Sequence, residues 1–537
     1  MTAYINGKVY VDKGQYAEAF IIEEGLFKAV GSNAEILAMA AGCETVDLKG
    51  NTVIPGLNDS HLHLCHVGEQ LVQVEINSCR SVNELIERCR EFIDKNPELV
   101  KHGLHGTGWN QDFFSDHRMP TRLDLDKIST EMPIVLERVC GHILTTNTRV
   151  IEILGLTAGS PQYEGGVFET DADGYPNGIF NEYACAPAVA VIPKPTFEEY
   201  EDLFVRAMDY AAAHGITSLQ SNDVGTSIAD TPVGYRLAHK VYDDGRAKIR
   251  YRHQSCFKNV EDMKHFITEE RADKRYNDML TLGPLKLFKD GSLGARTATV
   301  RHEYLDDPGN YGVDATSDEK MEAFVSAAAE MGLQVVTHVI GDDAVDRTIN
   351  LYEKYMDNGK NSLRHGLVHN QITDRPLLEK TAGLGILSLY QPIFLDYDMH
   401  VVESRCGKEL SSTSYAFKTF YELNPQLSSY GTDSPVENCN PFPCIYCAVT
   451  RQDKTGFPEG GFYPDEKVDV ETAVDCYTIG SAYVEFMEDK KGRIKPGYFA
   501  DFAVLDRDIF TCDPNEIKDI LPVLTVCDGK VAFEKRS

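Results

Sequence analysis

Long apolar stretches are missing from this sequence of 537 residues. Nowhere do 18 or more apolar residues run together, which argues against a membrane-spanning helix. Residues 1–7 contain no basic segment followed by an apolar stretch, so we predict no signal peptide. We therefore expect a cytoplasmic protein that makes no membrane contact.

Basic side chains are scarce relative to acidic ones, with 53 Lys and Arg against 83 Asp and Glu and a net charge of −30. Phosphate binding needs a cationic face, so we do not expect nucleic acid as a partner. The 42% hydrophobic and 25% charged residues are typical of a globular chain and exclude wholesale disorder. A core of this size needs no metal for folding, so we expect any bound metal to serve chemistry.

The 14 cysteines show no disulfide framework. Several lie inside apolar runs, which is typical of reduced, buried thiols in a cytosolic protein: Cys89, Cys140, Cys476 and Cys527. One Cys-x-x-Cys occurs, Cys444 to Cys447, but a zinc ribbon would need a second such pair. We therefore predict that this pair packs in a helix.

From about residue 200 the sequence alternates between amphipathic helices and short apolar strands. In one repeat, the predicted helix 198–213 stops at Gly215 and the strand 216–219 follows. Such alternation predicts parallel strands with crossover helices, in a doubly wound sheet or a (β/α)8 barrel. Counting residues 70–205 as an insertion leaves eight strands and favours the barrel. They end near His61, Leu219, His253, Lys289, His338, His369, Gln391 and Asp433.

The two chain ends and the insertion have elements of their own. Short strands with intervening turns, one of them predicted at residues 4–12, occur near both termini, and neither set is long enough to close a core alone. In the insertion, Ser81 and Glu84 form a capping box that opens a helix. The α/β chain is thus predicted to contain a composite β-sandwich (1–54 plus 495–537), a metal-binding barrel (55–70 plus 206–494) and an insertion (71–205) that contributes to the active-site cover.

The clearest local signal is His61-Leu-His63, which ends a predicted strand. In an extended segment, residues two apart face the same side, so both imidazoles can reach one ion. Imidazole nitrogen suits zinc and its first-row neighbours. His338, His369 and Asp433 end other strands, and barrel enzymes place their chemistry at that face. Taken singly, His61 and His63 would suit a loop or the core, His338 and His369 the core, and Asp433 a turn, so the prediction of a metal site rests on their convergence.

These motifs resemble the metal-dependent amidohydrolase superfamily, and more narrowly its YtcJ-like branch (amidohydrolase family 3), which includes the N-substituted formamide deformylases. The resemblance is carried by residues 55–63, 108–111, 138–142, 178–182, 215–218, 286–298, 338–342, 369, 431–437, 477–479 and 492–501. Two positions depart from the family pattern. Val368 stands where a glutamate is usual, and Asn110 stands where an aspartate is usual, so a charge is lost there.

The resemblance implies one or two divalent metal ions, with zinc expected, and a homodimer. It implies that the metal ligands are His61, His63, His338 and His369, together with Asp433 as ligand and proton shuttle. It also implies that Lys286 is carboxylated and bridges two metals. Independently, a desolvated lysine beside cations should have a depressed pKa, and its carbamate could span ions about 3.5–4 Å apart. Lys289 is the competing residue, and a lysine paired to a carboxylate is the alternative for Lys286.

The chemistry expected of this site is hydrolysis. Such a metal lowers the pKa of bound water to about 7, and Asp433 would accept its proton and pass it to the leaving nitrogen. Trp109, His142 and Arg296 are candidates for substrate contact, although Trp109 would equally suit a buried structural position. The resemblance implies a small amide or cyclic amide as substrate, with a non-peptide C–N bond, and the nearest relatives suggest an N-substituted formamide. The alternatives are a mononuclear deaminase, an ester-type hydrolase and a non-catalytic scaffold protein.

Overall fold

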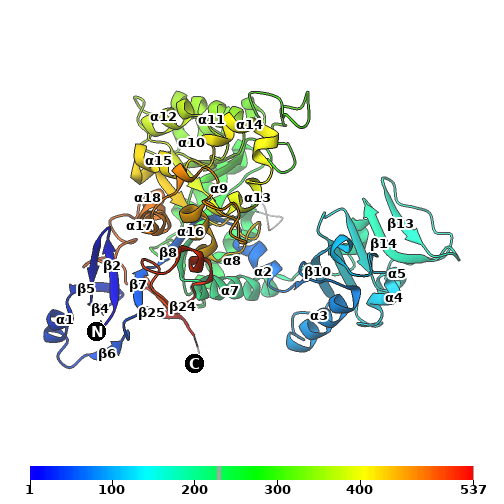
Figure 1. Ribbon diagram of the computed structural model, residues 1–537, viewed down its shortest axis with the longest axis horizontal. Coiled ribbons are helices and arrows are strands. Elements are labelled where there is room, and N and C mark those ends of the chain that lie inside the picture. The colour runs from blue at the N-terminus through cyan, green and yellow to red at the C-terminus, as the bar shows by residue number, and fades with distance from the viewer. Residues whose placement is uncertain (226–230, 536–537) are drawn as a thin grey trace. The chain divides into compact units, whose positions relative to one another are not determined.

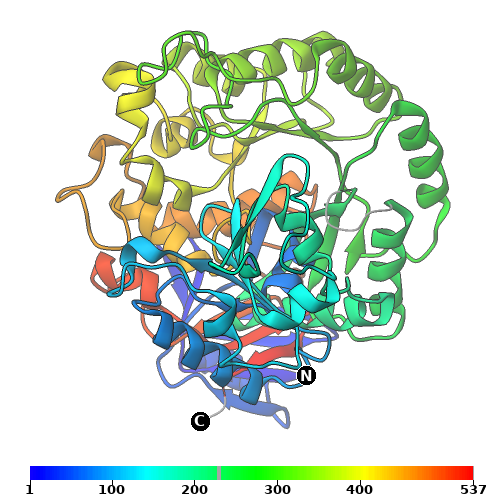
Figure 2. The ribbon, with the colours of Figure 1, turned by 90° about the vertical axis from the view of Figure 1, so that its right-hand side faces the viewer.

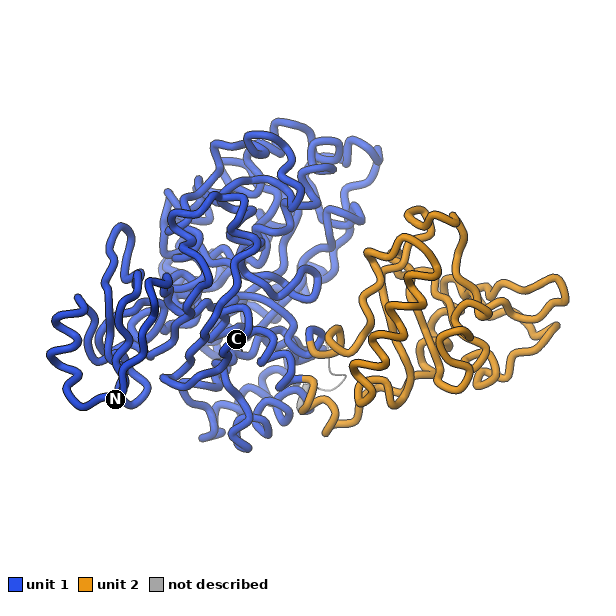
Figure 3. Tube along the Cα trace, turned by 60° about the horizontal axis from the view of Figure 1, so that its bottom comes forward, with its two compact units in different colours: residues 1–67, 204–537 blue, residues 68–203 orange. Residues whose placement is uncertain are grey.

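The computed structural model describes residues 1–225 and 231–535. The chain divides into two compact units, residues 1–67 with 204–537 and residues 68–203 (Figure 3). The second unit begins and ends within a few residues of the insertion proposed from the sequence. Its role as an active-site cover stays a prediction.

The first unit is built around a parallel barrel (Figures 1 and 2). Within the described residues its eight strands pair in the order β8 (Leu57–Leu62), β15 (Ile216–Val224), β16 (Arg250–Ser255), β18 (Leu285–Phe288), β19 (Val335–Val339), β20 (Gly366–His369), β21 (Leu387–Tyr390) and β22 (Ser428–Tyr430). The backbone N–H of Asp433 donates to His61 O at 2.9 Å, and that of His63 donates to Ser434 O at 2.8 Å. These bonds join the segment after β22 to β8, so the barrel is nearly closed, and the predicted parallel barrel is confirmed.

Helices follow the barrel strands and cover their outer side, as the green-to-yellow arc in Figure 2 shows. Met321 and Phe324 of α10 pack in one buried cluster with Leu285 of β18 and Val335 of β19. Ser317 caps α10, because its Oγ accepts the Lys320 N–H. The helices are α7 (Phe197–Ala213), α8 (Thr231–Asp243), α9 (Val260–Ala272), α10 (Asp318–Glu330), α11 (Asp342–Tyr355), α12 (Arg375–Gly383), α13 (Leu395–Asp398), α14 (Val402–Ser412), α15 (Phe417–Leu423), α16 (Pro441–Thr450), α17 (Val470–Asp475) and α18 (Ser481–Val484).

Strands from the two chain ends hydrogen-bond in one sheet, whose order is β25-β24-β23-β7-β2-β3. A second sheet has the order β5-β4-β1-β6, and both contribute to a shared cluster that includes Tyr4, Phe20, Val53 and Phe502. The description of these sheets as a separate sandwich domain stays a prediction. Their strands are β1 (Thr2–Ile5), β2 (Lys8–Asp12), β3 (Gln15–Ala17), β4 (Ala19–Glu23), β5 (Leu26–Gly31), β6 (Glu44–Asp47), β7 (Thr52–Pro55), β23 (Phe502–Leu505), β24 (Pro522–Cys527) and β25 (Lys530–Glu534), with α1 (Asn33–Met39) beside them.

The single strand predicted over residues 4–12 is wrong, because β1 and β2 are separate strands in different sheets. Asn6 adopts a φ of 59°, a left-handed conformation that asparagine tolerates better than most residues. An Asn-Gly pair is a strong turn signal, and here it redirects the chain from one sheet to the other.

The second unit contains one six-stranded sheet, of order β13-β14-β12-β11-β10-β9. Ser81 caps its helix α3 by accepting the Glu84 N–H at 3.1 Å. The predicted capping box is incomplete, because the Glu84 carboxylate accepts the Arg80 N–H instead of that of Ser81. The elements are α2 (Leu64–Gln70), which leads in from the barrel, β9 (Val74–Glu75), α3 (Val82–Lys95), β10 (Leu104–Trp109), α4 (Arg122–Leu125), β11 (Ile134–Arg138), β12 (Ile143–Thr146), α5 (Thr148–Ile153), β13 (Gly166–Thr170), β14 (Pro176–Glu182) and α6 (Cys185–Val189).

All 14 cysteines are free thiols, and Cys444 and Cys447 lie buried on α16 as predicted. Cys140 is exposed, so its assignment as a buried thiol is wrong. Among residues 1–225 and 231–535, no helix combines the length and apolar character needed to cross a membrane.

Candidate metal centre

His61 on β8 and His63, directly after that strand, point their imidazoles toward one carboxylate. The Nε2 atoms of His61 and His63 lie 3.3 and 3.2 Å from Asp433 Oδ1. Their Nδ1 atoms face carbonyl oxygens, Gln254 Oε1 at 2.6 Å and Asn222 O at 2.9 Å. An Nδ1 that lies beside a carbonyl oxygen carries the ring proton. The lone pair of Nε2 is then free to bind a metal, so Nε2 is the ligand atom.

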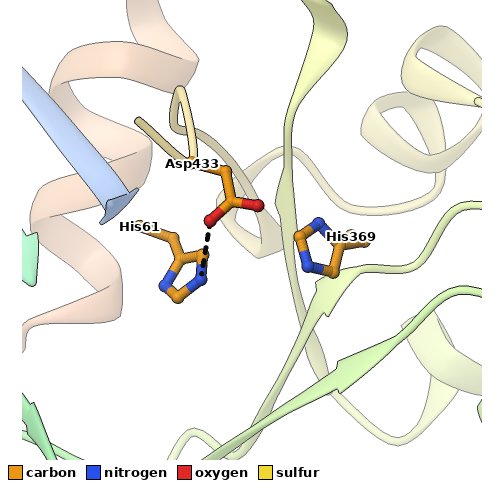
Figure 4. A group of neighbouring side chains, drawn as sticks. All are labelled: His61, His369 and Asp433. Atoms are coloured by element: carbon orange, nitrogen blue, oxygen red, sulfur yellow. Dashed lines mark ion pairs between the residues drawn. The ribbon is translucent and has the colours of Figure 1, made fainter. Parts of the chain in front are cut away.

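His369, at the end of β20, has the same arrangement. Its Nδ1 lies 2.7 Å from Gln391 Oε1. One ligand atom from each of His61, His369 and Asp433 lies within 4.8 Å of the other two, and Figure 4 shows their side chains around one point. His369 and Asp433 have φ angles of 76° and 55°. Left-handed backbone at non-glycine residues costs about 1–3 kcal/mol and clusters at functional sites.

His338, on β19, presents its other nitrogen. Its Nε2 lies 2.9 Å from Gly291 O and therefore carries the proton, which leaves Nδ1 as the ligand atom. The ring centroids of His338 and His369 are 4.5 Å apart. Four imidazoles and one carboxylate, which the sequence placed at the ends of four strands, thus gather at one end of the barrel.

Lys286, on β18, is a buried amine whose Nζ makes no hydrogen bond to any described residue. Its ammonium lies 3.6 Å from the centroid of the Phe288 ring, and burial lowers its pKa to about 8. Lys289, the competing residue, is paired with the carboxylates of Asp314 and Asp318, each at 2.8 Å. The alternative to carboxylation, a lysine paired to a carboxylate, therefore applies to Lys289 and not to Lys286.

The donor set fits a divalent metal ion. Imidazole nitrogen and carboxylate oxygen are zinc ligands, and they bind in their neutral and ionised forms respectively. Burial lowers the pKa of His61 to about 4 and of His338 to about 3, and it lowers that of His369 well below its usual value. Burial also disfavours the charged form of His63, but the Asp433 carboxylate 3.2 Å from its Nε2 outweighs this effect and raises the pKa of His63. Burial would raise the pKa of Asp433, yet the facing imidazoles of His61 and His63 hold it well below the ordinary range.

The three candidates for substrate contact lie in different surroundings. Trp109, in the second unit, is fully buried, and its Nε1–H donates to Leu136 O at 2.8 Å. His142, in the same unit, is exposed and lies 3.2 Å from Glu182 Oε2. Arg296 follows β18 in the first unit and pairs with Asp306 at 2.6 Å. Their roles in substrate binding stay predictions.

We expect Trp109→Ala to destabilise the second unit by about 3–5 kcal/mol, because it empties a large volume in the core and removes the bond to Leu136. Trp109 is the only tryptophan, so unfolding must be followed by circular dichroism in a denaturant titration. Phe113→Ala is the control, because Phe113 is 58% exposed and its loss should change stability by no more than about 0.5 kcal/mol. Equal unfolding midpoints for the two variants would contradict the prediction.

The residues that orient the histidines were not identified from the sequence. His253 was counted as a strand end, but its ring packs 4.3 Å from that of Tyr235, whereas the next residue, Gln254, faces His61. Successive residues of a strand point to opposite faces of the sheet. Because His253 faces away from the site, its neighbour Gln254 faces into it. Gln391 was noted only as a strand end. A polar residue at that position was the one available signal.

Comparison with known proteins finds similarity to amidohydrolases over nearly the whole chain. The model of the amidohydrolase family matches residues 44–533. The YtcJ protein of Bacillus subtilis is 30% identical over 535 residues, which is 98% of this chain and 97% of YtcJ. An N-substituted formamide deformylase of Arthrobacter pascens is 24% identical over 97% of this chain and 95% of its own length. The crystal structure of an uncharacterized metal-dependent hydrolase from Pyrococcus horikoshii superposes with a TM-score of 0.76 at 28% identity, covering 96% of this chain and 99% of that one.

Proposed function

Given that the chain belongs to the amidohydrolase family, we propose that this metal-dependent hydrolase cleaves a non-peptide carbon–nitrogen bond in a small amide or cyclic amide. The observation that carries the proposal is the convergence of ligand atoms from His61, His369 and Asp433. We propose zinc as the metal, held by these residues with His63 and His338. The homodimer and the cytoplasmic location stay predictions.

A divalent ion in this place, when bound, acidifies a coordinated water and polarises the carbonyl of the substrate. Asp433 is the residue suited to proton transfer. Its Oδ1 lies between two imidazoles, its carboxylate stays ionised, and it is buried away from bulk solvent. It would accept a proton at Oδ1 and deliver it to the leaving nitrogen, a role worth about 10²–10⁴-fold in rate. Gln254, Gln391 and the Asn222 carbonyl hold three imidazoles in the ligating tautomer.

We propose an N-substituted formamide as the first substrate class to test, because one relative over nearly the full length is named for that activity. Purified chain should be assayed for metal content and against a panel of N-substituted formamides, acetamides, cyclic amides and esters. Stoichiometric zinc and faster turnover of formamides would support the proposal. Turnover of esters alone, or of none of the panel by metal-loaded chain, would contradict it.

We expect Lys286→Ala to remove one metal ion per chain and most activity, with partial rescue by added short carboxylates. The reason is that a carbamate on the buried, unpaired Nζ would supply the two oxygens that span two ions. Elemental analysis and intact mass under non-acidic conditions measure both effects. Lys289→Arg is the control, because it keeps the positive charge facing Asp314 and Asp318 and should leave metal content unchanged. Unchanged metal stoichiometry in Lys286→Ala, and no carbon dioxide adduct on the wild type, would refute the carbamate.

A further inference from the structure

Asp290 is a buried carboxylate at the junction of two segments that follow barrel strands. It comes two residues after β18, and its side chain is fully shielded from solvent. Its Oδ1 accepts the Ile340 N–H at 3.0 Å, and its Oδ2 accepts the N–H groups of Gly341 at 2.8 Å and Thr299 at 3.0 Å. Three backbone donors thus converge on one carboxylate.

This carboxylate stands where α11 begins. Gly341 is the N-cap residue of α11 and has no side chain with which to cap the helix. A side chain at that position is sterically excluded, because a Cβ would lie 1.8 Å from Thr299 O. Carboxylates stabilise helix N-termini through the unpaired N–H groups and the helix dipole. Asp290 therefore accepts, from another segment, the backbone N–H groups of the N-cap glycine and of Ile340 before it.

The same carboxylate lies beside His338. The distance from Asp290 Oδ1 to His338 Nε2 is 3.6 Å, and the carbonyl of the adjacent Gly291 is 2.9 Å from that nitrogen. Two oxygens from consecutive residues thus face the same N–H. A proton on Nε2 leaves the lone pair on Nδ1, the tautomer opposite to that of His61, His63 and His369.

We propose that Asp290 is a positioning residue for the metal centre. It ties the start of α11 and the segment at Thr299 to the end of β18, and with Gly291 it holds His338 with Nδ1 directed into the site. It touches neither substrate nor metal and acts through His338. The inference rests on the proposed function, because it assumes that His338 is a ligand.

The test compares zinc affinity in Asp290→Asn and Asp342→Asn by competition with a chromophoric chelator. In Asp290→Asn an amide N–H₂ replaces one acceptor oxygen and faces backbone donors, so the junction loses at least one hydrogen bond. Residues that orient a ligating histidine typically contribute 10–100-fold to metal affinity, and we expect a loss of that size. Asp342 is the matched control: it is buried in the first turn of α11 and accepts the Arg301 N–H at 3.0 Å, without a contact to His338 among the described residues. We expect less than a threefold change there.

The outcomes separate this inference from the proposed function. If wild-type chain binds no zinc, the proposed function fails and the inference with it. If wild type binds zinc and the two variants lose affinity equally, or Asp290→Asn loses none, only the inference is overturned. Should Asp290→Asn not fold, the zinc-loaded wild type decides by nitrogen NMR of labelled histidine. The signal that disappears in His338→Gln must belong to an Nε2–H ring, and an Nδ1–H ring there would overturn the inference.

Discussion

Replacing His61 and His63 together by alanine is expected to abolish both metal retention and hydrolytic activity. The two Nε2 atoms lie 3.3 and 3.2 Å from the same oxygen of Asp433, so the pair forms one side of the donor set. Zinc sites in enzymes usually have three protein ligands and an open position, and the loss of two donors from one strand leaves too few to hold an ion on that side. Elemental analysis and turnover of the metal-loaded wild type and variant measure the effect.

His66→Ala is the control for this experiment. His66 lies on α2, and its ring centroid is 5.7 Å from that of His63, so the variant removes a neighbouring imidazole that is not part of the proposed donor set. We expect it to retain its metal. Full metal content in the purified double variant would refute the ligand assignment of both His61 and His63.

The barrel and the gathering of the metal-binding candidates could be predicted from the sequence because both depend on local pattern. The helix over residues 318–330 is marked by its cap, Ser317, and by apolar residues spaced for one face. A strand that follows such a helix must run parallel to the previous one, so His338 and His369 were expected at the same barrel end. That expectation needed no knowledge of distant contacts.

The remaining details depend on contacts between segments far apart in the chain. The strand expected to end near His369 starts at Gly366. Its start depends on its neighbours in the barrel, because Gly366 pairs with Val336 of β19 on one side and with Leu387 of β21 on the other. In the sequence, Asp290 was noted only within the motif at residues 286–298, and the three donors of its hydrogen bonds lie 9, 50 and 51 positions away. Nothing in local sequence indicates such a junction. Whether Gln254 or His253 faces the metal centre likewise depends on the register of β16, because a shift of one residue exchanges the two faces of a strand.

Asp433→Asn is expected to lower kcat/KM by about 10²–10⁴-fold, because it removes the group proposed to transfer the proton. The replacement keeps the shape of the side chain but removes the charge that two imidazoles face, and an amide cannot hold and return a proton at neutral pH. Zinc should bind more weakly yet still be retained at saturating concentration, because the imidazole donors remain. Assays therefore need zinc in excess, so that lost proton transfer is separated from lost metal.

Asp342→Asn is the matched control here, because it removes another buried carboxylate of the first unit, at the start of α11. Its kcat/KM should stay within a few-fold of the wild type. If zinc-saturated Asp433→Asn also turns over within tenfold of the wild type, Asp433 is a ligand without a proton-transfer role. The proton would then have to pass through another group, and the buried Asp433 carboxylate would serve only to hold the imidazoles of His61 and His63. A large loss with full metal occupancy would instead assign it the transfer step.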